Sequence, residues 1–156
     1  MPPRGPKAMA FTNSGSSVSI CITPQNTNLT EAAFAALDYV PIANVGNLGE
    51  RGANTNIVSY DAWDTNTTLK GKGITNAGDP QLEVAQDLSD PGQIAVRAAA
   101  AARADNYAFK VERQNGDAQY FRGLVTGPTE PGGRNEDFVL NVFTLALNQI
   151  PIDVAA

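Results

Sequence analysis

The sequence predicts a mainly β fold, a β-sandwich or partly closed barrel with one flanking α-helix and a long loop between strands. Three stretches indicate this fold class: a capped, alanine-rich helix at 91–104, a hairpin at 106–125 and a doubly apolar strand at 137–148. At 156 residues, 42% of them hydrophobic, the chain is long enough for one domain with a real core. We expect a flexible N-terminal arm at 1–17, rich in Pro, Gly and Ser, followed by one β-sandwich domain at 18–156.

Composition narrows the function classes. Charged residues make up only 17% of the chain, against about 25% in typical soluble domains, so much of the surface is uncharged or is covered in an assembly. The net charge of −5 argues against a nucleic-acid-binding module, which needs a basic face. We expect no signal peptide and no membrane helix, because no sufficiently long apolar run is present. Cys21, the only cysteine, reads as a small buried hydrophobe rather than a reactive thiol.

Three elements are expected before residue 50. The first is a short strand at 18–23. The second is a helix of about two turns at 30–38, beginning near Asn28 or Thr30, both residue types that cap helices well. The third is a strand at 39–48, placed at an edge or an end of the sheet by its proline.

The stretch 49–66 is a long polar excursion that carries the only tryptophan. Loops of this length in compact domains tend to be functional or disordered. Within and after it, strands are expected at 57–63 and 67–74, and two glycines in the second predict a bulge or a close backbone approach. Trp63 is either a core anchor or an interface anchor, and the residues leave both open.

A further strand is expected at 80–88. Alternation puts Leu82 and Val84 on one face and Glu83 and Asp87 on the other.

The helix at 91–104 carries the strongest local signals. Asp90 can cap its first turn, and Pro91 falls at the first helical position, where its missing N–H costs nothing. Gln93 can reach back toward the cap. Asp105 and Asn106 are expected to end the helix. Helical spacing predicts a small, flat packing face formed by Ile94, Ala98, Ala101 and Ala102.

Asn115-Gly116 at the centre of 106–125 is the strongest short hairpin signal. A two-residue turn would pair Val111 with Tyr120. In that register one face carries Tyr107, Phe109, Val111, Tyr120 and Leu124.

A Gly- and Pro-rich loop at 127–135 leads to the last strand, 137–148, which is apolar on both faces. An antiparallel sheet usually exposes one face to water, so this strand needs a second cover. The alanine-rich helix or a neighbouring subunit could supply it.

No arrangement of residues predicts catalysis. The chain contains no histidine, which excludes histidine-based triads and imidazole metal sites. Gly71-Lys72-Gly73 lacks the long glycine-framed loop of a phosphate site. No pair of carboxylates is singled out by its spacing. The residues alone therefore indicate a β-rich domain without an obvious active site and without a cofactor, and they leave a carboxylate-pair glycosidase open.

Taken together, the motifs resemble those of phage tail tube proteins, the major tail proteins of long-tailed, siphophage-type phages. The matching stretches are Thr30-Glu31-Ala32-Ala33, Val45-Gly46-Asn47-Leu48-Gly49, Lys72-Gly73 with Gly78-Asp79, Asp90-Pro91-Gly92-Gln93, Tyr107-Ala108-Phe109-Lys110, and Tyr120-Phe121 with Gly123 and Val125. Each stretch is weak alone, and their order and spacing carry the resemblance.

The resemblance implies a structural subunit whose hexameric rings stack into a hollow tube for genome delivery. The implied partners are other copies, tape measure, tail terminator and baseplate proteins, with DNA passing through the lumen without specific binding and no membrane contact. The implied location is the virion tail, assembled in the host cytoplasm. The alternatives are a type VI secretion-like tube protein, a small-ligand-binding β-barrel and a carboxylate-dependent hydrolase.

Two sets of site residues follow from this resemblance. An acidic lumen would repel DNA, which carries about one negative charge per 1.7 Å of its axis, and would let it slide. The candidate lumen-facing residues are Glu83, Asp87 and Glu112. The candidate inter-ring residues, in the polar excursion, are Arg51, Asn54, Asn56 and Trp63.

Overall fold

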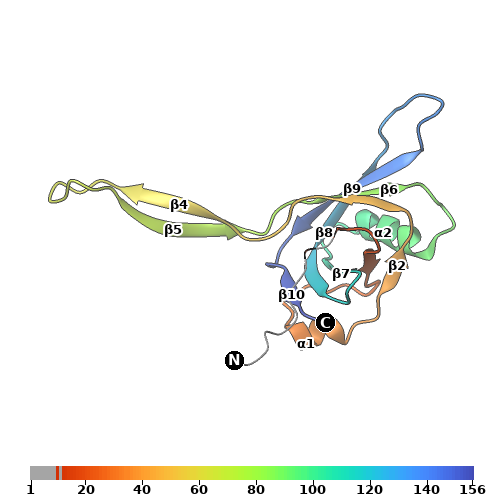
Figure 1. Ribbon diagram of the computed structural model, residues 1–156, viewed down its shortest axis with the longest axis horizontal. Helices are drawn as coiled ribbons and strands as arrows, with labels where there is room; N and C mark the ends of the chain where they lie inside the picture. Colours follow the sequence, from red (N-terminus) through yellow and green to blue (C-terminus); the bar gives the residue numbers. More distant parts are fainter. Residues whose placement is uncertain (1–9, 11) are drawn as a thin grey trace, which may run out of the picture.

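The computed structural model describes residue 10 and residues 12–156, so most of the N-terminal arm predicted at 1–17 lies outside the described residues. The described chain is mainly β, with one large antiparallel sheet, a separate two-stranded sheet and two helices (Figure 1). The large sheet contains β1 (Ser17–Ile20), β2 (Val40–Ile42), β3 (Val45–Leu48), β6 (Gln81–Ala85), β7 (Tyr107–Glu112), β8 (Ala118–Thr129), β9 (Leu140–Leu147) and β10 (Ile152–Val154). The helices are α1 (Glu31–Ala35) and α2 (Pro91–Ala101), and the small sheet is β4 (Asn54–Tyr60) with β5 (Leu69–Asn76). This confirms the predicted fold class.

The two edge strands of the large sheet, β2 and β3, are consecutive in the chain, so the sheet must curl to bring its edges together. The strand order is β2-β1-β7-β8-β9-β6-β3, with β10 pairing beside β9 on the long strand β8. The prediction of a single strand at 39–48 is wrong, since the chain turns a corner between β2 and β3 at Asn44, which has φ of 61°. Asparagine tolerates this left-handed conformation better than most residues. The result is a partly closed barrel around one core.

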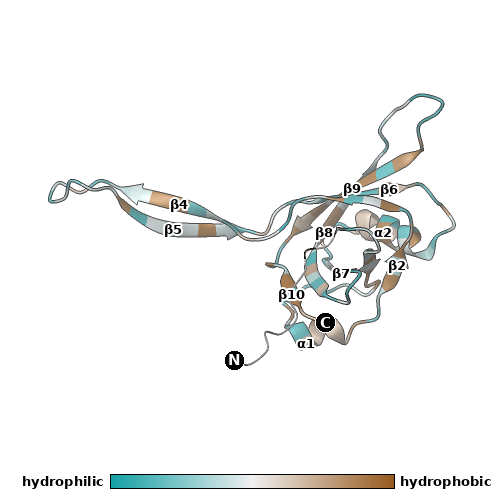
Figure 2. Ribbon diagram, viewed as in Figure 1, coloured by the Kyte–Doolittle hydropathy of each residue, from teal (hydrophilic) through white to brown (hydrophobic). Residues whose placement is uncertain are grey.

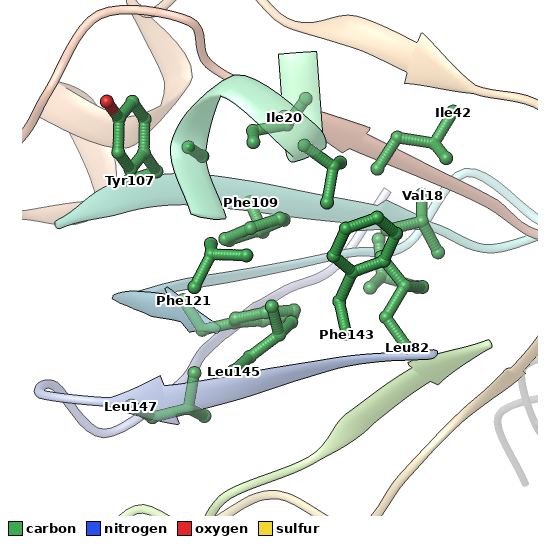
Figure 3. Close-up of a cluster of buried hydrophobic side chains, with 14 of the residues drawn as sticks. Val18, Ile20, Ile42, Leu82, Tyr107, Phe109, Phe121, Phe143, Leu145 and Leu147 are labelled. Atoms are coloured by element: carbon green, nitrogen blue, oxygen red, sulfur yellow. The ribbon is translucent and has the colours of Figure 1, made fainter. Parts of the chain in front are cut away.

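The core side of the sheet is lined by aromatic and branched side chains from six strands (Figure 3). Phe109 and Phe121 stack at its centre with ring centroids 5.5 Å apart. The labelled members in the figure are Val18, Ile20, Ile42, Leu82, Tyr107, Phe109, Phe121, Phe143, Leu145 and Leu147. Burial of this apolar surface is the main term that stabilises the domain.

α2 covers this core, but with a different face from the one predicted. Its buried residues are Gly92, Gln93, Val96 and Ala99. Ile94 is half exposed, and Ala98 and Ala101 face solvent. The predicted face is wrong because Gly92, not the alanine run, makes the closest approach: a Cβ atom there would meet the backbone of Pro41 and Ile42. The helix also ends at Ala101, short of the predicted 104, because Ala102 is extended.

The predicted cap of α2 is confirmed, but the side chain of Gln93 makes different contacts from the one predicted. Asp90 Oδ2 accepts hydrogen bonds from the amides of Gln93, at 3.0 Å, and Ala43, at 3.1 Å. The side chain of Gln93 does not reach back to the cap. Its amide nitrogen donates to the carbonyl oxygens of Ala43 and Ala85, both at 2.9 Å, and its oxygen accepts from the amide of Asp87. One buried side chain therefore joins α2 to the β2–β3 corner and the end of β6.

The hairpin of β7 and β8 exists, but its register differs by one residue from the prediction. Val111 pairs with Gln119, and Lys110, not Val111, pairs with Tyr120. The turn holds three residues, with Gly116 at φ of 94°, instead of two. Because side chains alternate, this shift of one moves Tyr120 to the outward face of the sheet.

The outward face is covered by α1 over only part of its area. Thr30 caps α1, whose Phe34 stacks on Tyr120 with ring centroids 5.5 Å apart in a second small core that includes Cys21. Elsewhere this face is half-buried. On β9, which begins at Leu140 and not at the predicted 137, Phe143 and its neighbours on the core side are buried. The outward residues Leu140, Val142, Thr144 and Ala146 are only partly covered. The predicted second cover of this strand is therefore incomplete in the single subunit.

Candidate functional site

A β-hairpin formed by β4 and β5, residues 54–76, projects from the body of the domain (Figure 1). We call it the projecting hairpin. Within the described part of the chain, its two strands pair only with each other. The polar excursion predicted at 49–66 is therefore not a plain loop, since most of it is the outgoing strand and the tip of this hairpin. Within residues 54–76, every side chain except those of Thr55 and Ala62 is exposed.

The hairpin carries the bulge that its glycines predict. Thr55 pairs with Thr75, whose hydroxyls lie 2.7 Å apart, whereas the next paired residue, Ile57, faces Lys72. β5 therefore places two residues opposite one at this point, a β-bulge. A Cβ atom at Gly73 would lie 3.3 Å from a methyl group of Val58, so glycine suits the crowded bulge.

The two faces of the hairpin differ in chemistry, and Figure 2 shows hydrophobic and hydrophilic stretches along β4 and β5. The register pairs Val58 with Gly71 and Tyr60 with Leu69, which gives one apolar face. The opposite face pairs Ile57 with Lys72 and Ser59 with Lys70, and it carries two cations. One side of the hairpin thus suits an apolar partner surface and the other suits water or an acidic one.

The tip, residues 61–68, places the only tryptophan in solvent. Trp63 is fully exposed and is flanked by Asp61 and Asp64. The turn is closed locally, with the Thr65 hydroxyl donating to the carbonyl oxygen of Thr67 at 2.7 Å. Of the two roles that the sequence left open, Trp63 is not a core anchor of its own subunit.

An isolated two-stranded hairpin is marginally stable in water. This one also exposes six large apolar side chains: Ile57, Val58, Tyr60, Trp63, Leu69 and Ile74. Concentrated exposed apolar surface marks a site of interaction with another molecule. The projecting hairpin is therefore the candidate functional site.

Three of the four predicted inter-ring residues lie on this hairpin. Asn54 and Asn56 are exposed on β4, and Trp63 is at the tip. Arg51 does not join them. Its guanidinium folds back on the body, donates to Gln119 and to the carbonyl oxygen of Gly49, and lies 5.6 Å from the ring centroid of Phe121.

The predicted lumen residues are only partly brought together. Glu83 and Glu112 lie on the outward face of the sheet, because their strand neighbours Val84 and Val111 are in the core. They belong to β6 and β7, which are separated by β8 and β9. Glu112 forms an ion pair with Lys110 at 3.8 Å.

Asp87 does not share the strand face of Glu83, so that part of the prediction is wrong. β6 ends at Ala85, and Asp87 lies in the turn before α2. Its carboxylate accepts hydrogen bonds from the hydroxyl of Ser89, at 2.7 Å, and from the Ser89 amide, at 3.0 Å. These bonds lower the pKa of Asp87 because they favour its ionised form. Its role within the subunit is to shape this turn.

A second projection was not anticipated. The segment 130–139 between β8 and β9 stands clear of the body (Figure 1) and exposes Phe138 and Val139. The sequence reads these two residues as the start of the last strand, since alternation alone does not separate a strand from an apolar loop end. Their exposure adds a smaller apolar surface, on a projection that points away from the projecting hairpin (Figure 1).

Chemistry of other kinds has little support in the described part of the chain. No group of three or more Asp, Glu, His or Cys side chains there could hold a metal ion. No helix among the described residues is long and apolar enough to cross a membrane. The thiol of Cys21 is buried and contacts the carbonyl oxygen of Thr23 at 3.6 Å.

No family model and no curated protein matches the chain in sequence. Solved structures match it in fold. A chain in the structure of the sheath/tube terminator of PVC, an extracellular contractile injection system, aligns with a TM-score of 0.67 and 11% identity over 95% of this chain and 99% of that one.

Two further matches come from the anti-feeding prophage. A chain of its baseplate aligns with a TM-score of 0.65 and 10% identity, over 96% of this chain and 98% of that one. A chain in the structure of its tube-terminating cap aligns with a TM-score of 0.60 and 12% identity, over 97% of both chains. At these identities the likeness concerns the fold alone, and it extends over nearly the whole chain: this protein has the fold of components of contractile injection systems, which are phage-tail-like particles.

Proposed function

We propose that this protein is a structural subunit of a phage-tail-like tube, and not an enzyme. Copies form hexameric rings, and the rings stack into a hollow conduit for genome delivery. The observation that carries the proposal is a hairpin with exposed apolar side chains, Val58, Tyr60 and Trp63 among them, on a fold shared almost end to end with tail components. A hairpin of this kind gains stability when a second copy covers it.

Within this assembly the projecting hairpin makes the contacts between rings. Asn54, Asn56 and Trp63 are the contacting residues, and Arg51 supports them from the body. Glu83 and Glu112 face the lumen, where their charge keeps DNA from binding the wall. The partners are other copies of the chain together with tape measure, terminator and baseplate proteins, in a tail that assembles in the host cytoplasm.

A second candidate is a subunit at the end of such a tube. The matches to a terminator and to a tube-terminating cap favour it. The two candidates differ in propagation, because a tube subunit stacks without limit whereas an end subunit forms a single ring.

Electron microscopy and sedimentation of the concentrated protein test both candidates. Long tubes support the tube subunit, and rings that never stack support the end subunit. A chain that stays monomeric at every concentration, with and without other tail proteins, contradicts both.

Shortening the hairpin tests its role in this assembly. Replacing residues 58–71 by Asn-Gly joins Ile57 directly to Lys72, its partner in the ladder, by a turn that suits a two-residue hairpin. The variant should fold and fail to form tubes. Trp63→Ala should weaken stacking without changing unfolding, since the side chain is fully exposed in the subunit, and Trp63→Phe should retain most of it. Normal tubes from the shortened chain would rule out the hairpin as the stacking contact.

A further inference from the structure

A cavity of about 290 Å³ opens between β1, β3 and β7, beside Arg51 in the segment that leads into the projecting hairpin. One part of its wall is apolar, with Val18, Leu48 and Val111 among the lining residues. The other part carries two guanidinium groups, Arg51 and Arg113. Among the described residues, no acid lines it. A cavity with an apolar wall and two convergent cations suits a ligand that combines an apolar body with a carboxylate.

The two arginines have neutral partners within the subunit. Arg51 is held by Gln119 and by the Gly49 carbonyl oxygen, and Arg113 donates to Oδ1 of Asn13 at 3.0 Å. Within the described chain neither forms a salt bridge, and residues 1–9 and 11 contain no acid. Burial first, and then the charge of Arg113, lower the pKa of Arg51. Two like charges therefore face this cavity without a salt bridge of their own within the described residues.

Acidic groups also stand near the two arginines: Arg51 lines a neighbouring pocket with Glu50 and Asp79, and Arg113 lines another with Asp117 and Asp153. The charge of Asp153 raises the pKa of Arg51, the opposite of the effect of Arg113. Gln119, which accepts a hydrogen bond from Arg51, donates one to the carboxylate of Asp153 at 2.9 Å. Ser16 also lines the cavity, and its hydroxyl is buried without a hydrogen-bond partner among the described residues. A buried hydroxyl without a partner costs free energy that an incoming acceptor would recover.

The tip of the projecting hairpin has the complementary chemistry. Residues 61–68 contain Asp61 and Asp64, no lysine or arginine, and the exposed Trp63 between the two acids. An aromatic ring also favours the neighbourhood of a guanidinium group. The tip therefore offers a carboxylate for each arginine and an apolar ring for the apolar wall.

We propose that the cavity beside Arg51 and Arg113 is the receptor for the Asp61–Asp64 tip of the projecting hairpin of a second copy. This rests on the proposed function, because it names the surface that the hairpin contacts. Tip and cavity are different surfaces of one chain, so the contact is head-to-tail and repeats from copy to copy. Such a contact builds rings or stacks without further components.

A charge exchange tests this pairing directly. Arg113→Glu alone, or Asp61→Arg with Asp64→Arg, should each raise the concentration needed for assembly roughly tenfold or more, because each places like charges together. The triple variant restores an opposite-charge pair at position 113 while Arg51 still faces a cation, so it should recover part of the lost assembly. The matched control combines Arg113→Glu with Glu130→Arg and Glu136→Arg, two exposed acids of the other projection, and should not recover.

Disulfide trapping gives a structural readout of the same contact. Asn47→Cys places a thiol at the cavity, and Asp64→Cys places one at the tip. Under mild oxidation the double variant should form a ladder of covalent oligomers, whereas Asp64→Cys with Asp38→Cys should not. Cys21 is buried and remains in all of these variants.

The outcomes separate this proposal from the proposed function. A triple variant that assembles no better than its parents, together with the absence of a ladder, overturns the cavity as the receptor. If the shortened hairpin still abolishes stacking, the function stands and the tip docks elsewhere. A wild-type chain that never self-associates overturns both.

Discussion

Gly92, the second residue of α2, lies directly against Pro41 of β2. A Cβ atom built on the glycine would overlap the carbonyl oxygen of Pro41 and would lie 2.6 Å from the Cα atom of Ile42. Both neighbours are backbone atoms, which cannot rotate away as a side chain can. The start of α2 can therefore pack directly on the edge strand β2 only because residue 92 has no side chain.

Gly92→Ala should consequently destabilise the subunit, by about 1–3 kcal/mol or more, because the helix must lift from β2. Gly46→Ala is the matched control, since no atom of the residues that the structure describes lies within 4 Å of a Cβ atom there. Urea unfolding of the dilute, unassembled protein measures both variants. Equal midpoints for the two would show that the helix start can shift freely.

The contact also explains which features the sequence could predict. The cap at Asp90 and the proline after it act on the first turn alone, so the local sequence is enough to predict them. Both predictions are confirmed. The buried face of α2 depends on a backbone contact with Pro41, fifty residues away in the chain, and helical periodicity in an alanine run cannot distinguish one face from another. The same holds for the hairpin register, which a single left-handed residue, Gly116, changes by one.

The candidate site was predicted in part for a similar reason. The sequence predicts strands at 57–63 and 67–74, and Val58, Tyr60 and Leu69 in this stretch form an apolar pattern that a sheet usually buries. The pattern does not say whether the cover comes from the same subunit or from another. Arg51 was assigned to the excursion by its position in the sequence, while its contacts with Gln119 and Phe121 depend on the fold.

The packing face of α2 yields a second prediction. Ala99 is fully buried against the core, whereas Ala98 faces solvent. Ala99→Leu should overpack the core and cost about 1–3 kcal/mol. Ala98→Leu should leave the unfolding midpoint of the free subunit nearly unchanged. The opposite order of the two variants in a thermal unfolding experiment would place the helix on the face expected from its sequence.

Gln93 provides a third prediction, on pH dependence. In Gln93→Glu a carboxylate would replace the amide that donates to the Ala43 and Ala85 carbonyl oxygens. Those oxygens favour the protonated acid, so the pKa of the introduced group is raised in the folded state. Below the pKa that this group has in the unfolded chain, the variant is therefore more stable than it is at neutral pH. It loses that extra stability as the pH rises through the higher pKa of the folded state.

The measurement for Gln93→Glu is urea unfolding of the variant and the wild type over a pH series. The free-energy difference between them should widen from acidic to neutral pH. Gln114→Glu, on the exposed turn of the β7–β8 hairpin, is the control and should show little pH-dependent difference. A constant deficit across the series would mean that Gln93 acts through its shape and not through its donated hydrogen bonds.

The last prediction concerns the charge of the proposed lumen. Glu83 and Glu112 share the outward face of the sheet but lie near opposite ends of it. The ladders align Glu83, through Val142, with Thr129 of β8, whereas Glu112 pairs with Ala118. Lys110 already offsets the charge of Glu112 at 3.8 Å. Within the described residues, no such ion pair is found for Glu83. If this face lines the bore, reversal of Glu83 should therefore change the interaction with DNA more than reversal of Glu112.

Assembled tubes of Glu83→Lys should retain short duplex DNA at low salt and release it as salt rises, because phosphate contacts are screened and exchange with counterions. DNA held in the bore should also resist nuclease, which separates it from DNA on the outer wall. Glu112→Lys should retain less, and Asp87→Asn, in the turn off this face, should behave as the wild type does. If nuclease destroys the retained DNA, Glu83 lies on the outside of the tube. Only a wall that surrounds the duplex can both bind it and protect it.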